Sequence, residues 1–122
     1  MSYDYIDTHA HLNLRQFDED RDEVLRRTRE GGVLHIAVGT RKETSTMAVE
    51  IAEANQGVYA IVGVHPLEVV GKDPDDDHGL LPEREFDTAF YTNLARSPKV
   101  VGIGECGFDY FRKGYQNRSA QM

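Results

Sequence analysis

The chain of 122 residues contains one cysteine, Cys106, and no long apolar segment. A single cysteine excludes an internal disulfide framework and agrees with a reducing compartment. No apolar run approaches the length needed to cross a bilayer, and no charged-then-apolar leader stands at the start of the chain. These absences predict a cytoplasmic protein with no membrane partner.

Basic residues are also few, because 14 Lys and Arg stand against 21 Asp and Glu, for a formal net charge of −7. This negative net charge argues against a protein that binds nucleic acid through a broad basic surface. It does not exclude an enzyme that reaches phosphate groups through bound divalent cations, since those ions supply positive charge locally. Much of the acidic excess lies in two runs, which we interpret as a helix start at 18–23 and a solvated loop at 73–77.

Two common catalytic patterns are missing. Gly102-Ile103-Gly104 lies inside a strand-like run and not between a strand and a helix, so the Rossmann and P-loop interpretations fail on context. No serine stands in a nucleophile-elbow setting. Cys106 follows Glu105 and is expected to point the opposite way, as a small buried hydrophobe and not as a nucleophile.

Short apolar runs and helical patterns alternate along the chain. The runs predict strands at 5–11, 33–40, 58–64 and 100–105. The helical patterns predict helices from Asp18 to the Gly31-Gly32 pair, at 44–55 and at about 85–96. The polar connection from Leu67 to about Arg84 is long enough to be functional or disordered. Strict alternation of strands and helices is typical of an α/β fold with a parallel sheet.

Polar side chains follow several of the predicted strands. His9 and His11 end the first strand, which we expect to be buried, and residues two apart on a strand point to the same side. His65 follows the third strand and Glu105 ends the fourth. Ligands of parallel sheets bind beyond the carboxyl ends of the strands, so these groups are predicted to meet. His35 begins the second strand, away from that end, and is interpreted as structural.

Four motifs in this order resemble those of one known family. They are Tyr5-Ile6-Asp7-Thr8-His9-Ala10-His11-Leu12, Val38-Gly39-Thr40, Gly63-Val64-His65-Pro66 and Gly102-Ile103-Gly104-Glu105-Cys106-Gly107-Phe108-Asp109-Tyr110. Together they are similar to the TatD DNases, within the metal-dependent (amidohydrolase-like) hydrolases. Phe108 stands where leucine is more usual in that family.

The resemblance implies a fold. It indicates an α/β protein with a TIM-type barrel, of which this chain supplies about four βα units, a half barrel. We expect residues 1–122 to form the N-terminal part of one TatD-like hydrolase domain, with the core of the match at about 3–112.

The resemblance also implies a site. His9 and His11 would bind a divalent metal ion, and Glu105 would bind or bridge two and serve as the catalytic carboxylate. His65 would contact a substrate phosphate, and Asp109 would help to shape the pocket. The implied reaction is hydrolysis of phosphodiester bonds in DNA, often exonucleolytic, with water activated by metal. Zn, Mn, Mg and Co are not distinguished by these ligands.

The chain departs from the family in extent. A full barrel has eight strands and roughly 250 residues, and the family's remaining ligands, two histidines and a late aspartate, find no counterpart after Tyr110. We therefore expect a truncated form that is weakly active or inactive alone, with self-association through open sheet edges. The alternatives are a non-catalytic remnant or metal-binding module, and a relative that hydrolyses another ester or an amide.

Overall fold

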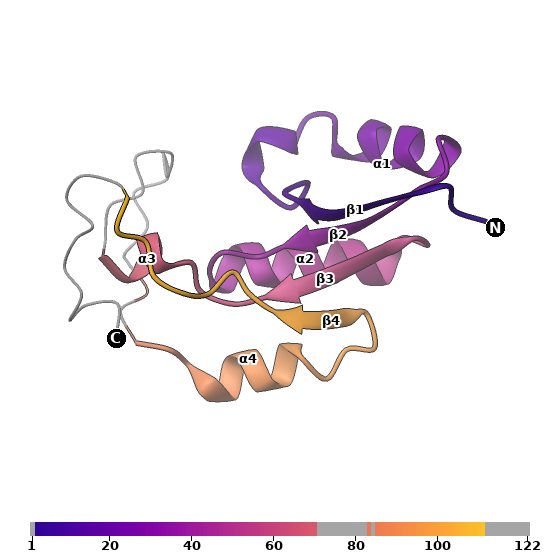
Figure 1. Ribbon diagram of the computed structural model, residues 1–122. Helices are drawn as coiled ribbons and strands as arrows, with labels where there is room; N and C mark the ends of the chain where they lie inside the picture. The colour runs from indigo at the N-terminus through magenta and orange to yellow at the C-terminus, as the bar shows by residue number, and fades with distance from the viewer. Residues whose placement is uncertain (1, 71–82, 84, 112–122) are drawn as a thin grey trace.

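The computed structural model describes residues 2–70, 83 and 85–111, and the acidic run at 73–77 lies outside them. Figure 1 shows an alternation of strands and helices, as the sequence predicts. The strands are β1 (Tyr5–Ala10), β2 (Val33–Val38), β3 (Val58–Val62) and β4 (Val100–Ile103). The helices are the 3-10 turn η1 (Arg15–Phe17), α1 (Arg21–Glu30), α2 (Lys42–Ala54), α3 (Pro66–Val70) and α4 (Thr88–Leu94).

The four strands form one parallel sheet in the order β1-β2-β3-β4. Each strand therefore pairs with its neighbour in the sequence, which is the order of a barrel before it closes. The prediction of an α/β fold that supplies about four βα units is confirmed. The carboxyl ends of all four strands lie at one edge of the sheet, on the side of α3 (Figure 1).

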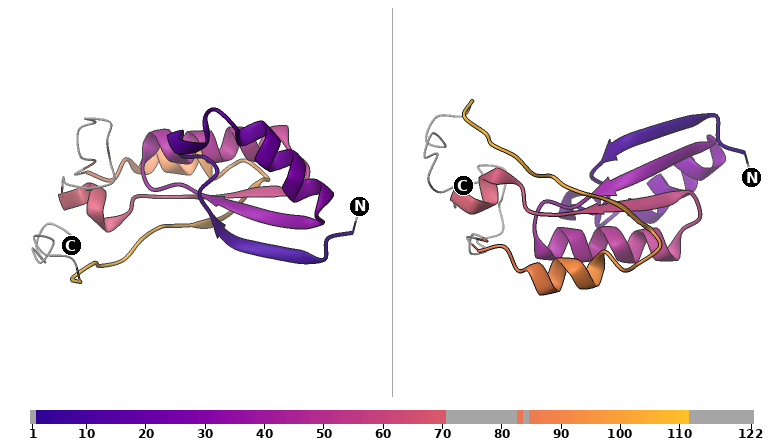
Figure 2. Two further views of the ribbon diagram at one scale, coloured as in Figure 1. Left: turned by 90° about the horizontal axis from the view of Figure 1, so that it is seen from above. Right: turned by 60° about the horizontal axis from the view of Figure 1, so that its bottom comes forward.

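Helices α1, α2 and α4 cover one face of the sheet (Figure 2). The core lies between this face and α2, where Ala48, Ile51 and Ala52 pack with alternate residues of β3. Because side chains alternate along a strand, Val58, Ala60 and Val62 all point into this core. The apolar spacing of α2 and β3 thus fixes which face the helices occupy.

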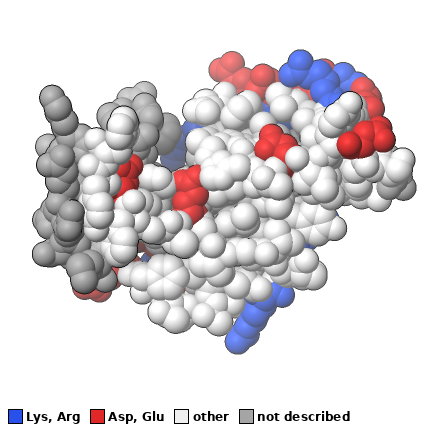
Figure 3. Space-filling model, viewed as in Figure 1, with Lys and Arg blue, Asp and Glu red and all other residues white. Residues whose placement is uncertain are grey.

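The opposite face carries no helix in the described part of the chain (Figures 1 and 2). Ile6, Val101 and Ile103 have 64%, 53% and 59% of their surface exposed. Figure 3 shows that most of this face is neither acidic nor basic, with a few Asp and Glu within it and Lys and Arg mainly at its margins. The prediction of a buried first strand is wrong, because β1 is an edge strand whose residues are almost all exposed.

The first helix begins later than the sequence predicts. Its N-cap is Asp20, and Asp18 instead accepts a hydrogen bond from the guanidinium of Arg21 at 2.6 Å. The same guanidinium donates to the carbonyls of Leu12 and Leu14. Arg21 thereby holds the turn that follows β1, and this turn carries His11.

Two other boundaries differ from prediction. Helix α3 occupies the start of the long connection after β3, where no helix is predicted from the sequence. Helix α4 begins at Thr88, three residues after the predicted start, because the carboxylate of Asp87 accepts the backbone N–H of Phe90 and caps it. No helix among the described residues is long and apolar enough to cross a membrane.

Candidate metal centre

Three side chains from opposite edges of the sheet meet beyond its carboxyl end. The Nε2 atoms of His9 and His11 are 3.2 Å apart, and Glu105 Oε1 lies 2.5 Å from His9 Nε2 and 3.7 Å from His11 Nε2. One potential ligand atom from each residue lies within 4.8 Å of the other two. The convergence predicted from the strand ends is therefore observed, although β1 already ends at Ala10 and its pairing shifts register after Asp7.

His11 is held in an orientation that suits metal binding. Its Nδ1 lies 3.0 Å from the carbonyl oxygen of Val38, which can only accept, so Nδ1 carries the proton. In the neutral ring Nε2 then keeps its lone pair and faces the cluster. A ligating histidine commonly donates its other ring N–H to such an acceptor, which fixes the tautomer and the ring direction.

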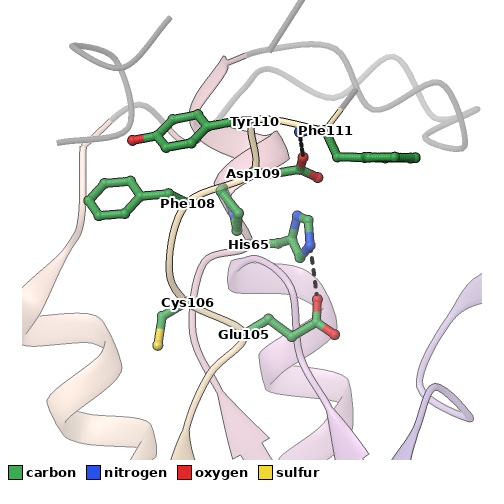
Figure 4. Close-up of a pocket in the computed structure, with 8 residues that line it drawn as sticks. His65, Glu105, Cys106, Phe108, Asp109, Tyr110 and Phe111 are labelled. Carbon is green, nitrogen blue, oxygen red and sulfur yellow. Dashed lines mark hydrogen bonds and ion pairs between the residues drawn. The ribbon is translucent and has the colours of Figure 1, made fainter. Parts of the chain in front are cut away.

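His65 has the opposite arrangement. The backbone N–H of Leu67 donates to His65 Nδ1 at 3.1 Å, so that in the neutral ring the proton lies on Nε2. This Nε2 faces Glu105 Oε2 at 3.2 Å (Figure 4). His65 is therefore a hydrogen-bond donor beside the cluster, whereas His11 presents a lone pair to it.

Glu105 is placed by close contact between strand ends. Its backbone N–H donates to the carbonyl of Gly39 at 3.2 Å, although Gly39 follows β2 and Glu105 follows β4. Between them lies the segment after β3, where a Cβ on Gly63 would come within 2.5 Å of the carbonyl oxygen of Gly104. Only glycine at position 63 permits this approach, which brings the carboxylate of Glu105 to the two histidines.

A hollow of about 520 Å³ adjoins the cluster. His65 and Glu105 lie at its base, and Asp109 is among the residues that line it (Figure 4). Asp109 Oδ1 also accepts the backbone N–H of Phe111 at 3.0 Å, which shapes the loop.

The Cys106 sulfur and the Glu105 carboxylate point to opposite sides, as expected. The expected burial of Cys106 is wrong, because β4 ends at Ile103 and the cysteine is exposed.

His35 lies away from this cluster, near the amino end of β2, and has only 2% of its surface exposed. Burial disfavours its charged form and lowers its pKa, while the carboxylate of Asp7 acts in the opposite direction. Neither ring nitrogen has a hydrogen-bond partner among the described residues. This placement agrees with a structural role.

Two polar features near the site were not predicted from the sequence. Buried Asn13 donates to the carbonyls of Val38 and Thr44, so it shares the Val38 acceptor with His11 and ties the end of β1 to α2. Its position directly after the His-x-His-Leu segment was the available signal.

Arg41 and Glu68, each with 7% of the side chain exposed, form an ion pair of 3.0 Å that joins α2 to α3. No local pattern indicates this pair, since 27 residues separate its members.

Comparisons with known proteins show to which family the chain belongs. The family model described as TatD related DNase matches residues 6–122. Over 106 residues the chain is 38% identical to "Uncharacterized metal-dependent hydrolase YabD" of Bacillus subtilis (strain 168), covering 86% of this chain and 37% of that protein. It is 36% identical over 108 residues to "3'-5' ssDNA/RNA exonuclease TatD" of Klebsiella pneumoniae (strain 342), covering 88% of this chain and 37% of that one.

A solved structure is similar as well. The crystal structure of YJJV, a TatD homolog from Escherichia coli K12, matches with a TM-score of 0.71 and 29% sequence identity. The match covers 96% of this chain and 42% of the YJJV chain. The chain thus spans well under half the length of these relatives. The family match, which extends over nearly the whole chain, shows that it belongs to the family of TatD-related DNases, which are metal-dependent hydrolases.

Proposed function

We propose that this chain is the N-terminal part of a metal-dependent hydrolase domain that cleaves phosphodiester bonds in DNA, exonucleolytically. We further propose that the chain alone holds one divalent ion weakly and turns over little or no DNA. The observation that carries the proposal is the mutual approach of His9, His11 and Glu105.

The donor set fits a divalent ion. Two imidazole nitrogens and one carboxylate oxygen form the kind of set that binds catalytic zinc and leaves a position for water or substrate. The same atoms suit manganese or cobalt, whereas magnesium would depend mainly on the carboxylate. When bound, such an ion activates water as a nucleophile and stabilises charge on phosphate oxygens. Glu105 has a second oxygen, Oε2, through which it could bridge to a further ion.

The remaining site residues would act on the substrate. The Nε2–H of His65 faces Glu105 Oε2 beside the hollow, and it would donate to a phosphate oxygen of a substrate bound there. Asp109 would fix the loop that forms the wall of the hollow. With these roles, the scissile phosphate would lie in the hollow next to the donor cluster.

A limited activity is proposed because of the number of ligands. In the part of the chain that the structure describes, one cluster of three residues is suited to hold a metal. A two-metal clamp on a phosphodiester needs ligands for a second ion about 3.5–4 Å from the first. The same observation favours a second candidate, a metal-binding module without turnover.

Two further properties are part of the proposal. Self-association is supported by the apolar sheet face that carries Ile6, Val101 and Ile103, and by the open edges of β1 and β4. A cytoplasmic location is supported by the single, exposed Cys106, which suits a reducing compartment.

The test combines metal binding with nucleotide release. Mn²⁺ and Zn²⁺ are titrated calorimetrically into the chain and into His9→Ala/His11→Ala/Glu105→Ala. Metal-dependent release of nucleotides from end-labelled single-stranded DNA is measured for the same proteins. Glu50→Ala, which removes an exposed carboxylate from α2, is the matched control. We expect one weak site that the triple variant loses and the control keeps. Two tight sites, or none in a folded protein, would contradict the proposal.

A further inference from the structure

Three aromatic residues lie exposed on the loop that follows β4. Phe108, Tyr110 and Phe111 have 59%, 38% and 96% of their surface exposed. None of them belongs to the hydrophobic core that α2 forms with the sheet. Large apolar side chains gathered at one exposed place commonly mark a binding surface.

Two of these rings already form a flat platform. The rings of Phe108 and Tyr110 are stacked, with 5.8 Å between centroids and 9° between planes. A base inserted between two rings needs about 7 Å, two contacts of roughly 3.5 Å each. The pair is therefore too close to hold a base between its rings, but it presents an outer face. Phe108, the more exposed ring, offers most of that face.

The platform adjoins the donor cluster. Phe108 and Tyr110 line the hollow at whose base His65 and Glu105 lie, and Figure 4 shows both rings to one side of it. None of the described residues that line the hollow is Lys or Arg. The described part of the hollow therefore offers a nucleic acid strand aromatic stacking surfaces and the metal centre.

We propose that the outer face of the Phe108–Tyr110 pair stacks with an unpaired nucleobase of a strand whose phosphate lies at His65 and Glu105. The proposal rests on the proposed function and adds a residue pair that selects its substrate. Every base has a π face, so such stacking tolerates sequence. Bases inside a duplex already have both faces covered, so the platform favours single-stranded ends.

Binding tests the platform without requiring turnover. Fluorescence anisotropy with Mn²⁺ present measures the affinity of the chain for a labelled oligothymidylate and for an abasic strand of equal length. Phe108→Leu removes the ring and keeps an apolar side chain, while Phe108→Tyr keeps the ring. Phe86→Leu is the matched control, because Phe86 is also exposed (55%) and stacked, on Tyr91, but does not line the hollow.

We expect Phe108→Leu to weaken oligothymidylate binding roughly tenfold and to leave abasic binding nearly unchanged. Phe108→Tyr and Phe86→Leu should bind as the parent chain does. Equal affinity of Phe108→Leu and the parent for oligothymidylate would overturn the platform but leave the proposed function standing.

Two other outcomes would also overturn the platform. A parent chain that binds Mn²⁺ but neither strand would overturn the platform and favour the second candidate function, a metal-binding module. If Phe108→Leu changes the oligomeric state in size-exclusion chromatography and leaves strand affinity intact, the rings form a contact between copies of the chain and not a base platform. A circular dichroism melt of each variant identifies any change in folding.

Discussion

The imidazole of His65 faces the carboxylate of Glu105, with 3.2 Å between Nε2 and Oε2. Because Leu67 donates to the other ring nitrogen, this contact is an N–H donor against a carboxylate acceptor in the neutral ring. His65 thus differs from His11, whose proton points away from the cluster to Val38. The two histidines both lie at the carboxyl end of the sheet, and their different backbone partners give them different chemistry.

This difference predicts separate effects for the two histidines. Replacement of His65 by alanine should leave the affinity for Mn²⁺ within about twofold of the parent value. The affinity for a phosphorothioate oligonucleotide should fall about tenfold, because the variant loses one hydrogen bond to a charged group. His11→Ala should lower metal affinity itself. Calorimetric titration with Mn²⁺ and anisotropy with the oligonucleotide measure the two quantities. Loss of metal binding in His65→Ala would make His65 a ligand and contradict the assignment.

The glycine at position 63 controls where Glu105 lies. A Cβ there would come within 2.5 Å of the Gly104 carbonyl oxygen, so Gly63→Ala must displace the end of β4. We expect a loss of about 1–3 kcal/mol in the free energy of unfolding, together with weaker Mn²⁺ binding. Gly102→Ala is the control, because its Cβ would make an ordinary contact at 3.4 Å with Ile61. Equal metal affinity in the two variants would show that Glu105 is placed by other contacts.

The buried ion pair of Arg41 and Glu68 should matter for folding. Removal of either partner takes one contact from the other's buried charge, and we expect Arg41→Met to lower the free energy of unfolding by about 3 kcal/mol and Glu68→Met by less. Arg41 also pairs with Glu43, an exposed residue, so that its charge keeps one partner in Glu68→Met. Urea unfolding of both single variants and the double variant measures the coupling. A loss in the double variant equal to the sum of the two would show that the pair does not couple.

Much of the fold follows from local patterns. Strands β2 and β3 lie within the sequence windows that predict them, and α2 overlaps most of its window but begins two residues earlier, at Lys42. Burial on the face that the helices cover dictates the apolar residues of all three. The boundaries of α1 and α4 were less predictable. The carboxylate of Asp18, the predicted N-cap, accepts a hydrogen bond from Arg21, and α1 begins after Asp20, whose side chain makes no capping hydrogen bond.

The site was predictable only in part. The rule that ligands meet at the carboxyl ends of parallel strands brought His9, His11, His65 and Glu105 to one place. His11 presents a lone pair to the cluster because of the Val38 carbonyl, and His65 presents an N–H because of the Leu67 amide. A sequence does not show such backbone contacts. The exposure of β1 was also missed, because its residues suit a buried strand and only the topology leaves it at an edge.

The buried His35 gives a pH dependence whose direction follows from its pKa. Burial lowers the pKa of this imidazole in the folded state, whereas in the unfolded chain it titrates near about 6.5. Below that pH the unfolded state binds a proton that the folded state does not, so stability falls as the pH drops. The fall ends once the pH is below the folded-state pKa, where both states are protonated.

Replacement of His35 by leucine should remove this dependence. Leucine has a similar volume and no polar atoms, so we expect His35→Leu to be more stable than the parent by about 1 kcal/mol at pH 7.5, since two unpaired buried nitrogens disappear. The difference should widen at pH 5.5. Urea unfolding of both proteins at the two pH values measures it, and the other histidines cancel in the comparison. A difference that stays constant or narrows at pH 5.5 would mean that His35 is protonated in the folded chain, through Asp7 on the neighbouring strand.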